Sequence, residues 1–91
     1  MSEGAALRRL ARHGLRSGTL PRGEPDHLWD GPGLGATCAV CTQPVRGDEV
    51  GYELQFAHHG HGRIPGRDRY HLHPECFAAW ELERTTLQDA R

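Results

Sequence analysis

Residues 38–46 read CAVCTQPVR and residues 70–77 read YHLHPECF, and these two stretches decide the fold. Each contains a pair of potential metal ligands separated by two residues. Zn²⁺ prefers four tetrahedral ligands drawn from thiolate sulfur and imidazole nitrogen, and a two-residue gap lets both side chains of a pair point into one concavity. The 31 residues between the pairs (42–72) are enough for a hairpin that returns the chain to the metal. The spacing predicts one zinc ion held by Cys38, Cys41, His73 and Cys76.

The residues between and after the two pairs predict strands and a helix. The apolar residues Val50, Tyr52, Leu54 and Phe56 alternate with other residues, which is the pattern of a half-buried strand. A polar loop is expected over residues 57–68 and a short second strand over residues 69–72. From Pro74 the pattern is helical, because proline suits the first helical position and the apolar positions that follow have helical spacing. The expected core consists of Tyr52, Phe56, Tyr70, Phe77 and Trp80.

The order of turn, hairpin and helix resembles the treble-clef zinc finger over about residues 37–90. Locally, YHLHPECF resembles the His-x-x-Cys-Phe stretch of a LIM half-domain, and CAVCTQPV resembles its opening knuckle. The interval between the pairs is longer than in LIM, so the resemblance implies the local geometry and the ligand set alone. WDGPGLGATCAVCTQPV together with YHLHPECFAAWELER also resembles a group of small bacterial proteins of unknown function. That second resemblance implies no activity.

Upstream of the metal ligands, residues 1–36 are expected to form an N-terminal arm, separate from a zinc-binding domain at 37–91. Residues 2–17 predict a short amphipathic helix with Ser2 as its N-cap and an apolar side formed by Leu7, Leu10, Ala11 and Leu15. Residues 18–36 are rich in glycine and proline, which indicates a linker or ordered coil with Leu28 and Trp29 as one hydrophobic anchor. Residues 1–23 carry a net charge of +4 and residues 24–91 a net charge of −5.

The composition supports a metal-stabilised domain. Only 36% of the 91 residues are hydrophobic, and 12 are glycine and 6 proline. A chain with so small a core is expected to need an additional stabilising element, such as disulfides, a metal ion or a partner chain. Three cysteines cannot all be paired within one chain, which argues against a secreted disulfide scaffold. No apolar run has the length of a signal-peptide core or of a bilayer span. We therefore expect a cytoplasmic protein that does not enter a membrane.

Several alternative interpretations of the same residues stay open. His71 lies two residues before His73 on the same expected strand face, so it can replace His73 as the fourth ligand. Cys38 and Cys41 can instead form a redox pair, or all three cysteines can simply be buried. His73-Pro-Glu75 also fits the His-x-Glu element of zinc deaminases, in which Glu75 would move protons for a metal-bound water. The reversed order of the elements and the spare thiol of Cys76 argue against that catalytic interpretation.

Other clusters have plain interpretations. His58, His59 and His61 are most simply part of a solvated loop, although they can also bind a second ion. Glu81, Glu83 and Asp89 are most simply the solvent face of the last helix.

The sequence thus predicts a small α+β domain stabilised by zinc, without enzymatic activity. Its expected role is that of a protein-interaction or regulatory module, because the zinc-binding domain is acidic. The alternative is a nucleic-acid-binding zinc finger that contacts phosphates through Arg8, Arg9, Arg12 and Arg16. Affinity that falls steeply with salt distinguishes the second role from the first.

Overall fold

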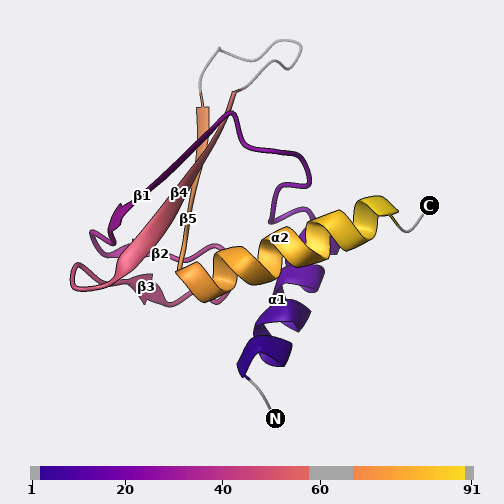
Figure 1. The fold of residues 1–91 in the computed structure, drawn as a ribbon, viewed down its shortest axis with the longest axis horizontal. Coiled ribbons are helices and arrows are strands. Elements are labelled where there is room, and N and C mark those ends of the chain that lie inside the picture. Colours follow the sequence, from indigo (N-terminus) through magenta and orange to yellow (C-terminus); the bar gives the residue numbers. More distant parts are fainter. Residues whose placement is uncertain (1–2, 58–66, 90–91) are drawn as a thin grey trace.

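The computed structural model describes residues 3–57 and 67–89 and contains two helices and five short strands (Figure 1). In chain order the elements are α1 (Glu3–Ser17), β1 (His27–Pro32), β2 (Ala36–Thr37), β3 (Pro44–Val45), β4 (Val50–Ala57), β5 (Arg67–Leu72) and α2 (Pro74–Asp89). The small α+β architecture predicted from the sequence is confirmed. The expected N-cap Ser2 and the histidines 58, 59 and 61 lie outside the described residues.

A three-stranded antiparallel sheet in the order β1-β4-β5 forms the centre of the molecule. The predicted hairpin of β4 and β5 is present, with Leu54 opposite Tyr70 and Tyr52 opposite Leu72. Successive side chains of a strand point to opposite faces of the sheet. Leu54 and Leu72 are fully buried, and Tyr52 stacks on Phe77 of α2 with ring centroids 4.6 Å apart. Helix α2 therefore covers one face of the sheet.

Strand β1 corrects the prediction that residues 18–36 are a linker or coil. Residues 27–32 pair with β4 along their whole length, with Leu28 opposite Leu54 and Trp29 opposite Glu53. Of the glycines and prolines that suggested a linker, four precede the strand, Gly31 and Pro32 are its last two residues, and Gly33 and Gly35 lie in the turn after it, so the pairing is not interrupted. Leu28 and Trp29 belong to an edge strand, and about half of each side chain is exposed.

Helix α1 has the predicted bounds and ends in a glycine-dependent turn. Gly18 has a φ of 86°, a left-handed conformation that glycine adopts readily, and Leu20 donates a backbone hydrogen bond of 3.0 Å to the Gly14 carbonyl. A side chain at Gly14 would overlap the buried side chain of Leu20. Leu15 is buried as predicted, whereas the predicted apolar residue Leu10 is 45% exposed.

Two arginines of α1 pair with a buried glutamate of α2. The Nε atoms of Arg8 and Arg12 lie 2.8 and 3.0 Å from the two carboxylate oxygens of Glu83. Glu83 is 2% exposed, so its placement on the solvent face was wrong. The arginines explain this burial, because a carboxylate enters an interior at tolerable cost when cations are bonded to both oxygens. The α1–α2 crossing is visible in Figure 1.

One buried cluster joins both helices, the cysteine turn and strands β3, β4 and β5. Its members are Ala11, Leu15, Leu20, Cys38, Val40, Val45, Leu54, Leu72, Cys76, Ala79 and Trp80. Residues from both predicted regions, 1–36 and 37–91, contribute to this core. Whether residues 37–91 also fold alone as a separate domain stays a prediction.

Candidate metal centre

Cys38 and Cys41 lie on a tight turn between β2 and β3. The two strands pair through Ala36 opposite Val45 and Thr37 opposite Pro44. Within the turn, the backbone N–H of Thr42 donates to the Cys38 carbonyl at 3.0 Å, and the N–H of Cys38 donates to the Gln43 carbonyl at 2.9 Å. These bonds fold the chain back on itself, so both sulfurs face the same side.

His73 and Cys76 lie at the junction of β5 and α2. The carbonyl of His73 accepts the first helical hydrogen bond, from Phe77 N–H at 2.8 Å, which makes His73 the residue that precedes the first turn. Pro74 begins the helix, as its fixed φ favours. Cys76 stands three residues after His73, and both side chains reach the same side of the helix start.

A backbone contact brings the two ligand pairs together. Cys38 forms an isolated parallel bridge with His71, and the N–H of Ala39 donates to the His71 carbonyl at 2.8 Å. The turn that carries the cysteines is thereby attached to the end of β5, just before His73. This backbone contact therefore brings the two ligand-bearing segments to the same place.

The four predicted ligands form one cluster. One ligand atom from each of Cys38, Cys41, His73 and Cys76 lies within 4.8 Å of all the others. Nδ1 of His73 is 3.4 Å from the sulfur of Cys41 and 3.8 Å from that of Cys76. Bonds of 2.3 Å to sulfur and 2.0 Å to nitrogen at tetrahedral angles separate an S and an N ligand by about 3.5 Å. The cluster therefore has the size and the donor set to hold a metal ion.

The other ring nitrogen of His73 fixes which tautomer faces the cluster. Nε2 lies 3.1 Å from the Pro44 carbonyl, which can only accept, so Nε2 carries the hydrogen. Nδ1 then presents its lone pair to the sulfurs. Glu49 lies 3.9 Å from the same Nε2. Such outer partners orient histidine ligands and raise their basicity.

The pKa values of the three cysteine thiols are shifted in different directions. A hydrogen bond from Cys76 lowers the pKa of Cys38 to about 4, so Cys38 is a thiolate at neutral pH. The same bond raises the pKa of Cys76, and burial raises the pKa of Cys41. Burial is the largest single influence on His73 and opposes a positive charge, but the hydrogen bond and charge of Cys38, the Pro44 carbonyl and the charge of Glu49 together raise the pKa of the imidazole. An incoming metal ion meets one preformed thiolate and displaces the remaining protons.

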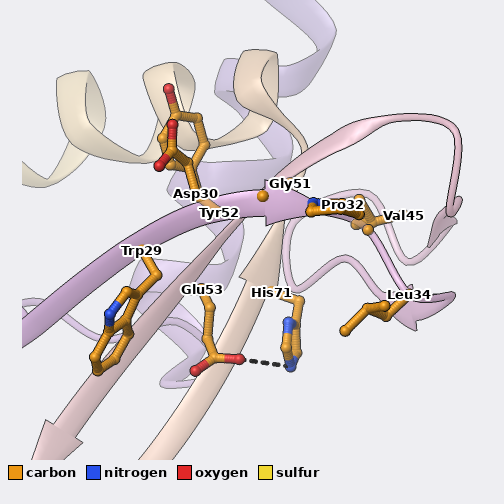
Figure 2. A pocket seen from close by; sticks show the side chains of 11 residues that line it. Trp29, Asp30, Pro32, Leu34, Val45, Gly51, Tyr52, Glu53 and His71 are labelled. Carbon is orange, nitrogen blue, oxygen red and sulfur yellow. Dashed lines mark ion pairs between the residues drawn. The ribbon is translucent and has the colours of Figure 1, made fainter.

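The structure distinguishes the two candidate histidines. His71 stays within β5, and its side chain lies on the far face of the sheet, with Nε2 3.9 Å from the carboxylate of Glu53 (Figure 2). The expectation that His71 and His73 share a strand face was wrong, because β5 ends at Leu72. His73 is thus free to turn toward the cysteines.

Two contributors to the site were not predicted. The carbonyl of Pro44 and the carboxylate of Glu49 both approach His73, and neither has a signal in the sequence beyond following the cysteine turn. Glu75, considered as a proton shuttle, is exposed in the first turn of α2. A carboxylate at that position is favoured by the helix dipole, so its presence has a structural reason.

Comparisons with models of protein families, with curated proteins and with solved structures found no match to this chain. Among the described residues, neither helix combines the length and the apolar character needed to cross a bilayer.

Proposed function

We propose that Cys38, Cys41, His73 and Cys76 hold one structural Zn²⁺ ion and that the chain is a treble-clef zinc finger. The observation that carries this proposal is the cluster of three thiols and one imidazole within 4.8 Å. Soft thiolates with imidazole favour zinc over magnesium, calcium or manganese. The order of cysteine turn, β4–β5 hairpin and α2 beginning at the second ligand pair supports the treble-clef assignment.

The zinc has a structural role and the domain is not an enzyme. Catalytic zinc keeps one position for water or substrate, whereas four protein ligands complete a tetrahedron. Cys38 and Cys76 are almost fully buried. When bound, such an ion contributes on the order of 10 kcal/mol to folding, which compensates for a core of ten small and medium side chains around one tryptophan.

The domain acts through its surface, as a protein-interaction or regulatory module. Several large apolar side chains are exposed on β1 and on the turn after it: Leu28 is 48%, Trp29 47% and Leu34 86% exposed. Leu34 also has a φ of 61°, a left-handed conformation that is unfavourable for a bulky residue. A bulky apolar side chain that is held in this conformation and is largely exposed supports a role in contacting another molecule.

Nucleic-acid binding is the less supported alternative. Two of its four candidate arginines, Arg8 and Arg12, are bonded to Glu83, which neutralises part of the positive charge on α1. The net charge of −5 on residues 24–91 would also repel phosphates.

The two parts of the proposal have separate tests. Native mass spectrometry of the purified chain should give about one zinc per molecule, and a chelator should unfold it. A folded, reduced, metal-free chain would contradict the structural zinc. For the interaction role, a protein captured by the zinc-loaded chain should rebind after purification and lose affinity for Leu34→Ser. The control is Leu10→Ser, which removes an exposed leucine of α1. If this variant binds as tightly as the original chain, the loss seen with Leu34→Ser is specific to the turn after β1.

A further inference from the structure

The sheet face opposite α2 contains a cavity of about 230 Å³ (Figure 2). Gly31 on β1 and Gly51 on β4 are directly opposite one another. A Cβ at Gly31 would meet no atom within 4 Å, whereas Cγ1 of Val45 occupies the space over Gly51, so the open part of this row lies over β1. Trp29, Leu34 and Val45 form apolar walls around the gap. Figure 2 shows Trp29, Glu53, His71 and Leu34 on the same side of the sheet, while Tyr52 and Asp30 point to the other.

One carboxylate stands in the middle of this apolar surface. Glu53 is flanked in the strand register by Trp29 on β1 and His71 on β5. Its two oxygens have neutral or weakly basic neighbours: Nε2 of Gln55 donates to Oε2 at 2.6 Å, and Nε2 of His71 is 3.9 Å from Oε1. In the part of the chain that the structure describes, no arginine is within ion-pair distance of Glu53, and neither arginine nor lysine lines the cavity.

We infer that this cavity binds the side chain of an arginine from a partner protein, an inference that rests on the proposed interaction role. The apolar stem of the arginine packs on Trp29 and Leu34, and the guanidinium meets the Glu53 carboxylate between the two flanking rings. Arginine suits this surface better than lysine because its planar, weakly hydrated group stacks on aromatic faces and bonds a carboxylate with two N–H groups.

The charge of the surrounding chain favours the same ligand. Residues 24–91 carry −5, so a cationic segment is attracted to the region while a phosphate-bearing strand is repelled. The exposed Trp29 ring also has a nearly parallel neighbour, His27, with centroids 5.1 Å apart and 23° between the planes. The indole is thereby held in one orientation and loses little freedom when it binds.

Titration of the zinc-loaded chain with short blocked peptides tests the inference. The probe is an Ac-Gly-Arg-Gly amide, with citrulline and lysine versions as controls, and the readout is the Trp29 indole N–H in NMR spectra. We expect the arginine peptide to shift this resonance and to bind about tenfold more tightly than the citrulline peptide, which has the shape but not the charge.

Three variants place the binding site. Glu53→Gln, followed by the same indole resonance, and Trp29→Ala, followed by the backbone N–H of Gly31 because the indole is removed, should each weaken binding about tenfold. Gly31→Val should also block it without unfolding the chain, because a Cβ at Gly31 meets no atom within 4 Å. Leu28→Ala is the matched control: Leu28 neighbours Trp29, has the same exposure, and lies on the opposite face of the sheet.

Several results would overturn the inference. These are equal binding of the arginine and citrulline peptides, undiminished binding by Glu53→Gln, or tighter binding of a single-stranded oligonucleotide at the same tryptophan. Each result is distinguishable from failure of the proposed function. A chain that keeps its zinc and binds its protein partner equally well after Glu53→Gln retains the interaction role and loses only the arginine site.

Discussion

The indole nitrogen of Trp80 donates a hydrogen bond of 2.8 Å to the backbone carbonyl of Pro21. Trp80 is fully buried at the middle of α2, and Pro21 belongs to the segment that follows α1. The bond therefore attaches that segment to the helix that begins at the metal centre. The guanidinium of Arg84, itself buried, lies 4.9 Å above the centre of the indole.

Replacing Trp80 with phenylalanine removes this bond and leaves a small cavity. We expect Trp80→Phe to lower the free energy of unfolding by about 2 kcal/mol, the sum of an unpaired carbonyl and lost packing. Urea denaturation of the zinc-loaded chain measures the change. Trp29→Phe is the control, because Trp29 is 47% exposed and the substitution should have little effect. Similar losses for both variants would mean that the Pro21 contact does not contribute.

Removing the two candidate histidines should have different effects on zinc. We expect His73→Ala to weaken zinc binding by more than about 100-fold, since losing a direct ligand costs more than losing an outer partner. His71→Ala should keep its zinc, because that side chain lies on the other face of the sheet, beside Glu53. Competition with a colorimetric chelator measures both affinities. A larger loss in His71→Ala would show that the assignment of the fourth ligand is wrong.

Glu83 should make stability depend on pH. The hydrogen bond from Arg12, together with Arg8, lowers the pKa of Glu83 below its ordinary value of 4.5. A carboxyl group whose pKa is lower in the folded chain than in the unfolded chain stabilises the fold at pH values above its unfolded pKa. For Glu83 this stabilisation disappears as the pH falls from 4.5, the unfolded pKa, through the lower folded pKa. Glu83→Gln should therefore cost about 1–2 kcal/mol at pH 7 and progressively less below pH 4.5.

The measurement for Glu83 is the difference in unfolding free energy between the variant and the original chain at each pH. Zinc release in acid affects both chains alike, and Arg84 and Glu81 bond each other beside the site in both, so the difference isolates Glu83. A difference that does not change with pH would contradict the linkage.

Gly33 and Gly31 should respond differently to the same substitution. A Cβ at Gly33 would overlap the backbone carbonyl oxygens of Val45 and Arg46, whereas a Cβ at Gly31 meets open space. We expect Gly33→Ala to cost at least about 2 kcal/mol and Gly31→Ala less than about 0.5 kcal/mol. Thermal unfolding compares the two. Equal stabilities would mean that the turn between β1 and β2 adjusts more easily than these close backbone contacts suggest.

Salt dependence distinguishes a protein-binding from a nucleic-acid-binding chain. We expect labelled DNA and RNA to bind weakly, with a log–log salt slope well short of the value near −3 to −4 that four phosphate contacts by Arg8, Arg9, Arg12 and Arg16 would give. Fluorescence anisotropy at low and moderate salt measures the slope. Tight binding that is lost when Arg9 and Arg16 are replaced would instead support the nucleic-acid alternative.

The metal cluster could be predicted from the sequence because its signal is local. Two residues between ligands, a turn and a helix start each fix geometry over a few positions, and the four ligands follow from them. The β4–β5 hairpin and α2 were predictable for the same reason, since period-two and helical spacing are properties of short segments.

The parts that could not be predicted depend on contacts between distant segments. Strand β1 forms because β4 presents a free edge, and its glycines and prolines indicate a linker when the partner is unknown. Glu83 looks like a solvent-facing residue until α1 brings Arg8 and Arg12 to it from 75 and 71 residues away. His71 was ambiguous because the single residue at which β5 ends decides which way His73 points.

Because a ribosome releases the chain from its N-terminal end, the position of α2 in the sequence has a consequence for biosynthesis. Helix α2 is the last described element, and it supplies Cys76, the anion that holds Arg8 and Arg12, and the indole that holds Pro21. Until it leaves the exit tunnel, α1 has no partner helix and Cys38 and Cys41 lack half of their ligand set. The nascent chain thus presents the thiols of Cys38 and Cys41 before Cys76 is available to complete the cluster.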